Sequence, residues 1–250
     1  MAYRFIICLV ISFGLSQNAD SLFMQGSSYL ESGKYEKAVV MFETILNQGF
    51  FHEDLYYNLG NSYYRLGSYG HTIWAYEKAM ELNPLDGDTK FNLALANTYV
   101  KDRIQVPETL FLLKWYRFLK SSLTFSQFLS ISALFILLAS IYYLVVKVFR
   151  IDFSWLPLKI FLFCAFFLHG ILLDKYWEIS ERNEGIITEY EVEAFSGPFV
   201  RSDAVLFKIH EGIKVSIDHD QGDWVEISLL DGKKGWIKTN QLRFLLTHPV

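Results

Sequence analysis

A pattern of small and aromatic residues that returns after 34 residues constrains the fold more than any other feature of the sequence. Five positions of the first copy match five of the second: Gly26 and Gly60, Tyr29 and Tyr63, Gly33 and Gly67, Tyr35 and Tyr69, and Phe42 and Tyr76. A truncated third copy begins at Phe91, where residues 91–94 match residues 57–60. A fixed period of this length indicates similar supersecondary units, each of which buries one face on its neighbour.

The residue types within this repeat fit a helix–turn–helix unit. Gly60 is small where two helices must approach closely, and Gly67 is expected to end the first helix with a positive φ. The second helix is expected to stop at Asn83 and Pro84, because proline cannot continue a helix.

The segments Leu55–Tyr63 and Ala75–Pro84 resemble the tetratricopeptide repeat (TPR), a helical repeat that binds proteins. The resemblance implies an α-helical solenoid of about 2.5 repeats over residues 20–104. In such arrays the first helices line a concave surface. A helix over about Thr89–Lys101 is expected to cover the exposed end.

Composition divides the chain into three regions. The content of 52% hydrophobic and 17% aromatic residues is high for an ordinary soluble protein. Acidic residues outnumber basic ones in residues 20–106 and 178–250, whereas basic residues outnumber acidic ones in residues 107–177. Acidic ends argue against nucleic acid as a partner, since phosphates require a basic face.

Cys8 and Cys164 lie in apolar runs, so neither end has a disulfide framework or a cysteine metal site.

The beginning of the chain has the residue order of a secretory signal peptide. Arg4 precedes an apolar run over residues 5–15, which is too short to span a bilayer comfortably, and a short polar stretch follows. We therefore expect a signal peptide over residues 1–19 that is cleaved after Ser16 or Ala19. The alternative is an uncleaved anchor.

Two further apolar segments are expected to form a transmembrane helical hairpin. Residues 125–146 carry no charge and are long enough to cross a hydrocarbon core of about 30 Å. The predicted parts are a juxtamembrane linker over residues 105–122, spans over 123–147 and 153–175, and a cytoplasmic loop over 148–152.

Residues near the ends of the hairpin suit the membrane interface. Tyr142 and Tyr143 at one end, and Tyr176 and Trp177 at the other, fit interfacial aromatic belts, and Lys159 is expected to extend its ammonium to the interface. Basic residues are nearly balanced on the two sides, so the signal peptide determines the expected orientation. It sends the repeats and the C-terminal region out of the cytoplasm, at a bacterial inner membrane. An even number of spans keeps both on one side.

His169 is the only titratable group deep in the second span. It either marks a proton relay, as in a transporter subunit, or bonds a nearby hydroxyl or carbonyl. We favour the second interpretation, because neither span has an acidic residue near its middle that could act as a relay partner. Small residues of the first span suit close helix packing: Ser130, Ser132, Ala133, Ala139 and Ser140.

Residues 182–247 change to short runs in which apolar and polar residues alternate. Val215 and Ile217 alternate with polar residues, and Asp231 and Gly232 predict a tight hairpin turn. The spacing predicts five or six short strands, which indicates a small β-barrel.

The order of turns and tryptophans over residues 185–245 resembles a bacterial SH3-like domain. Lys238 and Leu242 stand where proline-binding SH3 domains have proline and tyrosine, so a polyproline groove is not expected. Trp224 and Trp236 are the candidate surface residues, with Trp224 the better candidate for an exposed edge. The alternative is that both rings pack within the barrel.

No catalytic set is apparent. No two of the six histidines have i, i+4 spacing, and the sequence has no glycine-rich phosphate loop and no nucleophile elbow. The run Asp218, His219, Asp220 resembles a metal-ligand cluster, but it precedes Gln221–Asp223, so we interpret it as a solvated hairpin turn. We expect no enzymatic activity, no cofactor and no metal site.

The candidate peptide-binding residues lie on the first helices of the repeats. Asn58 and Asn92 occupy equivalent positions that suit hydrogen bonding to an extended peptide, although Asn58 alternatively braces its neighbouring helix. The other predicted groove residues are Tyr57, Asn61, Tyr64 and Arg65. TPRs that bind chaperone tails use a basic clamp for a carboxylate. That clamp is absent here, because the third-repeat positions carry Asp88 and Asn92.

The order of signal peptide, TPRs, two membrane helices and SH3-like barrel resembles the BatE family of the bacterial aerotolerance operon over nearly the whole chain. The resemblance implies von Willebrand A-domain membrane proteins as partners and, indirectly, a MoxR-type AAA+ ATPase. We therefore expect an α + β multidomain membrane protein that acts as a non-enzymatic scaffold in an aerotolerance or envelope-stress complex. The alternative is a cell-wall (peptidoglycan)-binding adaptor that recruits an envelope enzyme.

Overall fold

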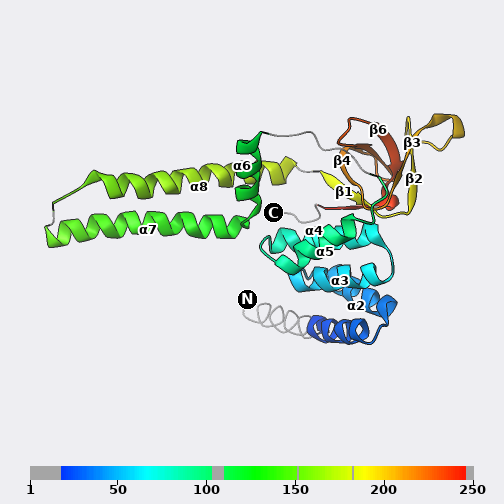
Figure 1. Cartoon of the computed structure of the whole chain (residues 1–250), viewed down its shortest axis with the longest axis horizontal. Helices are drawn as coiled ribbons and strands as arrows, with labels where there is room; N and C mark the ends of the chain where they lie inside the picture. The colour runs from blue at the N-terminus through cyan, green and yellow to red at the C-terminus, as the bar shows by residue number, and fades with distance from the viewer. Residues whose placement is uncertain (1–17, 103–109, 151, 182, 246–250) are drawn as a thin grey trace, which may run out of the picture. The chain divides into compact units, whose positions relative to one another are not determined.

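The computed structural model describes residues 18–102, 110–150, 152–181 and 183–245 (Figure 1). They form two compact units. The repeat–sheet unit combines helices from residues 18–82 and 86–102 with strands from residues 183–245, and the hairpin unit contains the helices of residues 110–181. The predicted signal peptide lies, up to residue 17, outside the described residues.

The helices of the repeat–sheet unit follow the repeat period. A helix over residues 18–31 is followed by α2 (Tyr35–Asn47), α3 (Glu53–Arg65), α4 (Tyr69–Leu82) and α5 (Gly87–Asn97). As predicted, α4 ends directly before Asn83 and Pro84. The start of α5 lies before the expected Thr89, because the Asp86 carboxylate caps the helix and accepts a hydrogen bond from the Thr89 amide at 2.8 Å.

Three glycines explain the geometry of the repeat. Gly67 follows α3 with a φ of +74°, and Gly33 has the same φ one period earlier, which confirms the predicted positive φ. A Cβ added at Gly60 would lie 2.5 Å from Tyr76 Cε1. The prediction that Gly60 is small where two helices approach is therefore also confirmed.

Seven strands form one antiparallel sheet in the order β3-β2-β6-β5-β4-β1-β7. In chain order the strands are β1 (Glu184–Ile187), β2 (Glu191–Phe195), β3 (Val205–His210), β4 (Lys214–Asp220), β5 (Trp224–Ser228), β6 (Lys234–Lys238) and β7 (Leu242–Phe244). Short 3-10 helices at Ser202–Ala204 and Thr239–Gln241 precede β3 and β7. Buried aliphatic side chains, among them Val192, Val225 and Ile237, form the core of the sheet.

The sheet differs from the sequence expectation in strand number and closure. It has seven strands rather than five or six, because β1 and β7 are too short for an alternating pattern to be visible. β3 and β7 remain the two edges of the described sheet, so the sheet is not closed into a barrel. The SH3-like resemblance therefore stays a prediction.

The Asp218–Asp220 run was expected in a hairpin turn, but these residues belong to β4. The turn follows them, where Gly222 has a φ of +82°. The acidic side chains are already paired: Asp218 accepts a hydrogen bond from Lys234 Nζ at 2.6 Å, and Gly222 N donates to Asp220 Oδ1 at 2.8 Å. His219 Nδ1 lies 2.6 Å from Glu226 Oε2 on the paired strand β5.

The sheet packs on α4 within the repeat–sheet unit. Trp74 Nε1 of α4 donates a hydrogen bond to the Phe244 carbonyl of β7 at 2.9 Å. Ile186 of β1 and Leu245 beyond β7 are fully buried, and both belong to the same apolar core as the helices. The sequence pattern predicts the repeats and the sheet as independent modules, but in the structure the sheet has its own core and also contributes Ile186 and Leu245 to the core of the repeats.

An ion pair connects α2 to the last strand. Arg243 of β7 donates to both carboxylate oxygens of Glu43, at 2.5 and 3.0 Å, and its guanidinium lies 3.6 Å from the centre of a Trp74 ring. Tyr63 Oη donates to Glu43 Oε1 at 2.8 Å. Burial raises the pKa of Glu43, but the hydrogen bonds and charge of Arg243 outweigh it and lower the pKa overall. Glu43 is therefore ionised at neutral pH.

His71 gives this unit a predicted sensitivity to acid. Burial, followed by the charge of Arg243, lowers the pKa of His71 from 6.5 to about 4, against the opposing effect of Glu43. Between these values the unfolded chain binds a proton that the native state does not, so the free energy of unfolding falls as pH falls. We expect a loss of about 2–3 kcal/mol between pH 7 and pH 4 from this group.

Acid unfolding of the His71→Gln variant measures this contribution. The variant should lose less stability than the wild type over the same pH range, because its side chain does not titrate. The control is His52→Gln, since the His52 side chain is 67% exposed. Equal acid sensitivity in His71→Gln and His52→Gln would contradict the prediction.

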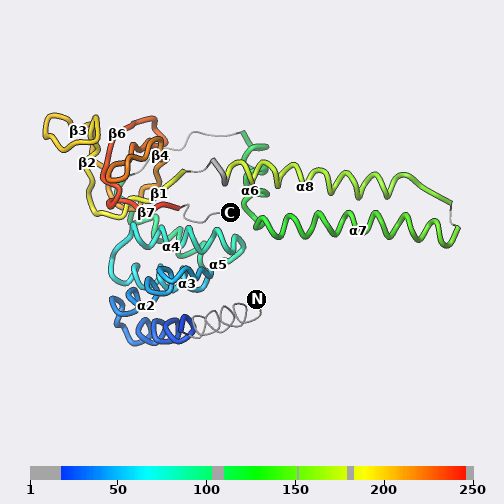
Figure 2. Tube along the Cα trace, turned by 180° about the vertical axis from the view of Figure 1, so that it is seen from behind, coloured from blue at the N-terminus to red at the C-terminus, as the bar shows by residue number. Residues whose placement is uncertain are grey.

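The hairpin unit consists of α6 (Phe111–Ser121), α7 (Phe125–Phe149) and α8 (Trp155–Glu181). α7 and α8 lie side by side, and α6 runs across one end of the pair (Figures 1 and 2). Two segments are long and apolar enough to cross a membrane: Phe125–Phe149, with a mean hydropathy of 2.3, and Trp155–Glu178, with 2.1.

The helix boundaries differ from the predicted spans. α7 begins two residues after the predicted 123, because Thr124 and Gln127 form a capping box in which each side chain bonds the other's amide. α8 continues to Glu181, beyond the predicted end at residue 175. Residues 111–121, expected to be part of a linker, form the helix α6 instead.

His169 contacts a hydroxyl and a carbonyl. Its Nδ1 lies 2.6 Å from Ser132 Oγ of α7 and 3.0 Å from the Ala165 carbonyl one turn earlier. Ser132 is fully buried between the helices. These contacts agree with the favoured interpretation that His169 bonds a nearby hydroxyl or carbonyl, and we assign His169 to helix packing.

Candidate functional site

A groove of about 500 Å³ crosses the helices of the repeats. Its lining residues come from the helix of residues 18–31 and from α2, α3, α4 and α5: Leu30, Glu31, Tyr35, Asn61, Tyr64, Arg65, Tyr76, Asn92 and Leu95. Most of these side chains carry a polar group, so the groove offers hydrogen-bonding positions beside aromatic rings.

A hydrogen-bonded group of side chains orients the polar residues of the groove. Asn61 Oδ1 accepts hydrogen bonds from Tyr76 Oη at 2.7 Å and from Asn92 Nδ2 at 3.4 Å. Asn92 Nδ2 also donates to Tyr57 Oη at 3.2 Å. Burial, followed by the nearby Tyr57 and Tyr64, raises the pKa of Tyr76, so its phenol stays protonated and acts as a donor. Both amides are thereby held in defined orientations before any ligand arrives.

Charge and aromatic rings surround this polar group. Arg65 and Glu31 are exposed and supply one positive and one negative side chain. Tyr64 lies edge-on to Tyr69 and Tyr99, whose rings stack with centroids 4.4 Å apart. The arrangement can hydrogen-bond, stack and pair charges. It contains no nucleophile activated by a neighbouring base.

The structure brings four of the six predicted peptide-binding residues together in the groove: Asn61, Tyr64, Arg65 and Asn92. Tyr57 is half-buried and is not among the lining residues, but it bonds to Asn92 and its ring lies 6.1 Å from that of Tyr76, centre to centre. Asn58 is not among the lining residues, and its carbonyl accepts a hydrogen bond from Ser62 Oγ at 2.8 Å.

Several lining residues were not predicted from the sequence, although the repeat contained the signal for them. Leu30 and Glu31 lie one period before Tyr64 and Arg65, and Leu95 lies one period after Asn61. Projecting each candidate by 34 residues in both directions would have found all three.

The second pair of candidates, Trp224 and Trp236, lies on adjacent strands β5 and β6. Both rings are half-buried, on the side of the sheet opposite Val225 and Ile237. Phe195 lies edge-on to Trp224 at 5.9 Å, and His219 stacks on Trp236 at 6.5 Å. The two tryptophans are therefore partly packed and partly accessible.

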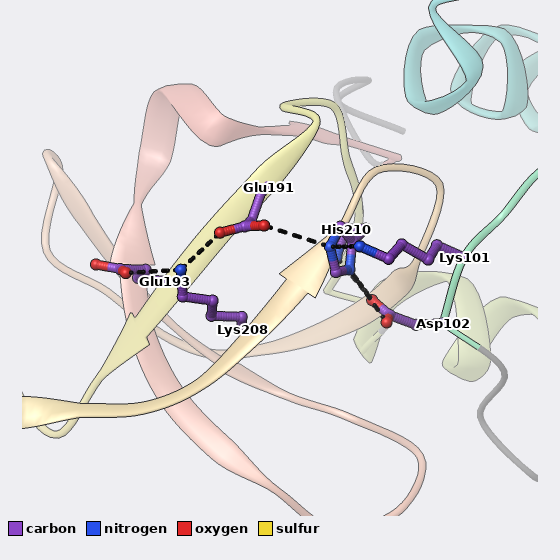
Figure 3. A network of polar contacts seen from close by, with 6 residues as sticks. All are labelled: Lys101, Asp102, Glu191, Glu193, Lys208 and His210. Carbon is purple, nitrogen blue, oxygen red and sulfur yellow. Dashed lines mark hydrogen bonds and ion pairs between the residues drawn. The ribbon is translucent and has the colours of Figure 1, made fainter.

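A separate polar network fixes the chain after α5 to the β2–β3 hairpin (Figure 3). Asp102 Oδ2 accepts a hydrogen bond from the His210 backbone amide at 2.7 Å, and Asp102 Oδ1 lies 3.1 Å from the ring Nδ1 of His210. His210 Nε2 lies 2.8 Å from Lys101 Nζ, and Lys208 joins Glu191 at 2.7 Å. The network connects residues more than 100 positions apart and holds the segment after α5 against the sheet.

Within the residues that the structure describes, no three His, Cys, Asp or Glu side chains gather as a metal site would require.

Comparison with known proteins identifies the helical part of the chain. Residues 19–47 and 53–84 match the family model of the tetratricopeptide repeat. A solved structure described as that of YrrB, a TPR protein with an unusual peptide-binding site, is similar at 20% identity and a TM-score of 0.31. The match covers 65% of this chain and 76% of that one. No curated protein matches the sequence. These two segments are TPRs, and TPRs indicate a protein-binding adaptor or scaffold.

Proposed function

We propose that the protein is a non-enzymatic, membrane-anchored adaptor whose TPR groove binds an extended segment of a partner protein. The observation that carries the proposal is the groove lined by Asn61, Arg65 and Asn92 with their tyrosine neighbours. A peptide backbone offers one donor and one acceptor per residue, so it requires side chains of both kinds. Fixed amides, a cation and an anion in one groove meet this requirement, and the tyrosine rings provide surface for apolar side chains.

The hairpin unit supports the membrane anchor. Its α7 and α8 have the length and hydropathy of membrane spans. The repeat–sheet unit is built from residues that precede and follow this hairpin in the chain. Its two halves must therefore lie on one side of any membrane that the chain crosses, which requires an even number of spans. The signal-like N-terminus favours the extracytoplasmic side.

The resemblance to BatE proteins names a partner for this adaptor. We propose von Willebrand A-domain membrane proteins as its direct partners and a MoxR-type AAA+ ATPase as an indirect one, in an aerotolerance or envelope-stress complex. The order of modules along the sequence supports this assignment.

Crosslinked, detergent-solubilised affinity purification of the full chain tests the groove. The Arg65→Glu, Asn92→Ala double variant should recover at least about tenfold less of its partner, because interface anchors cost about 2 kcal/mol or more when removed. The matched control is Lys90→Glu, Asn97→Ala, which makes the same reversal of charge and the same Asn→Ala change at exposed positions outside the groove. Equal recovery with both double variants would exclude the groove as the binding site.

The half-exposed Trp224 and Trp236 favour a second candidate function, binding of cell-wall peptidoglycan by the sheet. Aromatic rings on an exposed sheet face suit stacking on sugar rings. Purified peptidoglycan should then retain the full-length protein, and it should not retain a Trp224→Ala, Trp236→Ala variant. Retention that persists in this variant, or no retention of the wild type, would exclude this candidate.

A further inference from the structure

Three groups of side chains on α6 differ in their surroundings. Tyr116 and Leu119 pack against the core formed by Phe128 of α7 and by Ile171 and Leu172 of α8. A second face is aromatic and exposed, with Phe111 79%, Trp115 54% and Phe118 63% accessible. These positions have i, i+4, i+7 spacing and so form one stripe. Lys114 and Arg117 are exposed beside it and form a basic face.

Polar contacts hold α6 firmly across the end of the hairpin. Tyr116 Oη donates to Asp174 Oδ2 at 2.6 Å, and Lys120 Nζ contacts both Asp174 and Glu178 at 2.6 Å. Lys175 Nζ of α8 donates to the Lys120 carbonyl at 3.1 Å. These contacts therefore hold the exposed aromatic stripe beside the end of the apolar part of α8.

We propose that α6 lies in the membrane interface, with its aromatic stripe in the outermost acyl region and its basic face on anionic lipid phosphates. This inference rests on the membrane anchor proposed above. A lipid surface fits better than another protein for two reasons. The stripe is continuous with the end of two apolar helices, where Tyr176 and Trp177 are also exposed. Lys114 and Arg117 beside it complement anionic headgroups.

Environment-sensitive probes at single cysteines test the proposal in the full chain. Cys8 and Cys164 are first replaced by serine, and an NBD fluorophore is attached to Phe118→Cys, on the stripe, or to Arg117→Cys, on the basic face. Vesicles contain phosphatidylcholine and phosphatidylglycerol with nitroxide-labelled lipids. We expect quenching by a nitroxide on the upper part of the acyl chain to be about twofold or more stronger at position 118 than at 117, as for a helix buried on one side. Charge reversal at Lys114 and Arg117 should remove the dependence of this quenching on phosphatidylglycerol.

A probe at Leu137→Cys, in the middle of α7, separates the two proposals. If a nitroxide deep in the bilayer quenches position 137 while position 118 remains water-exposed, the anchor stands and the interfacial helix is wrong. A blue-shifted probe at 118 that lipid nitroxides do not quench would mean that protein covers the stripe, which also overturns the inference. If position 137 is not quenched, the membrane anchor fails and the inference fails with it.

Discussion

Replacing Arg243 by alanine is expected to lower the free energy of unfolding of the repeat–sheet unit by about 2–4 kcal/mol. The guanidinium makes two hydrogen bonds to Glu43 and lies 3.6 Å from the centre of a Trp74 ring. The Arg243 and Glu43 side chains are only 28% and 21% exposed. The truncation would leave the Glu43 carboxyl group largely buried without its cation, and this loss accounts for most of the expected effect.

Chemical denaturation of the full chain in detergent, monitored by tryptophan fluorescence, measures this effect. The control is Arg201→Ala, because Arg201 also makes a two-pronged contact with an acid, Asp203, but both side chains are 65% exposed. An exposed pair contributes less than about 1 kcal/mol. A double-mutant cycle with Glu43→Gln should give a coupling energy of about 1 kcal/mol or more. Equal effects of Arg243→Ala and Arg201→Ala would contradict the structural role of the pair.

The Gly70→Ala substitution is expected to destabilise the same unit by about 1–3 kcal/mol. A Cβ at this position would lie 2.4 Å from the Ile187 carbonyl oxygen and 2.8 Å from Thr188 Cα. Both are backbone atoms, one in the last residue of β1 and one in the residue that follows it, and they cannot rotate away. The displaced helix would also strain the hydrogen bond from the Gly70 amide to Glu211 Oε2, at 2.7 Å. In an isolated helix the same change would stabilise by up to about 1 kcal/mol, so the sign of the effect reports the contact with the sheet.

The matched control for Gly70→Ala is Gly87→Ala at the start of α5. A Cβ at Gly87 meets nothing within 4 Å, so this variant should be as stable as the wild type or slightly more stable. Denaturation of both variants under identical conditions gives the comparison. A Gly70→Ala protein as stable as Gly87→Ala would mean that α4 and the sheet are not packed as described.

The sequence predicted the repeats well because their signal is local and periodic. Gly60, Gly67 and Pro84 each have a conformational reason to occupy their positions, and the structure places them accordingly. The contact between the repeats and the sheet had no such signal. Glu43 and Arg243 are 200 residues apart, and the sequence around either residue does not indicate that it forms an ion pair.

The helix α6 was not predicted, for a different reason. The spacing of Phe111, Trp115 and Phe118 is helical, but basic residues between them break the apolar run, so the segment was read as a linker. In the groove, the repeat predicted the correct helices, but only side-chain packing could separate Asn61 and Asn92, which line it, from Asn58, which does not.

Photocrosslinking from inside the groove tests the central claim most directly. A photoreactive phenylalanine analogue replaces Tyr64, which lines the groove, or Tyr190, which is 71% exposed in the bend between β1 and β2 and lies outside the groove. The adaptor account predicts that position 64 of the membrane-embedded full chain crosslinks to one short segment of a partner protein. It also predicts that Arg65→Glu abolishes this crosslink and that position 190 does not form it. Crosslinking that is absent at position 64, or equal at 64 and 190 and insensitive to Arg65→Glu, would contradict the account.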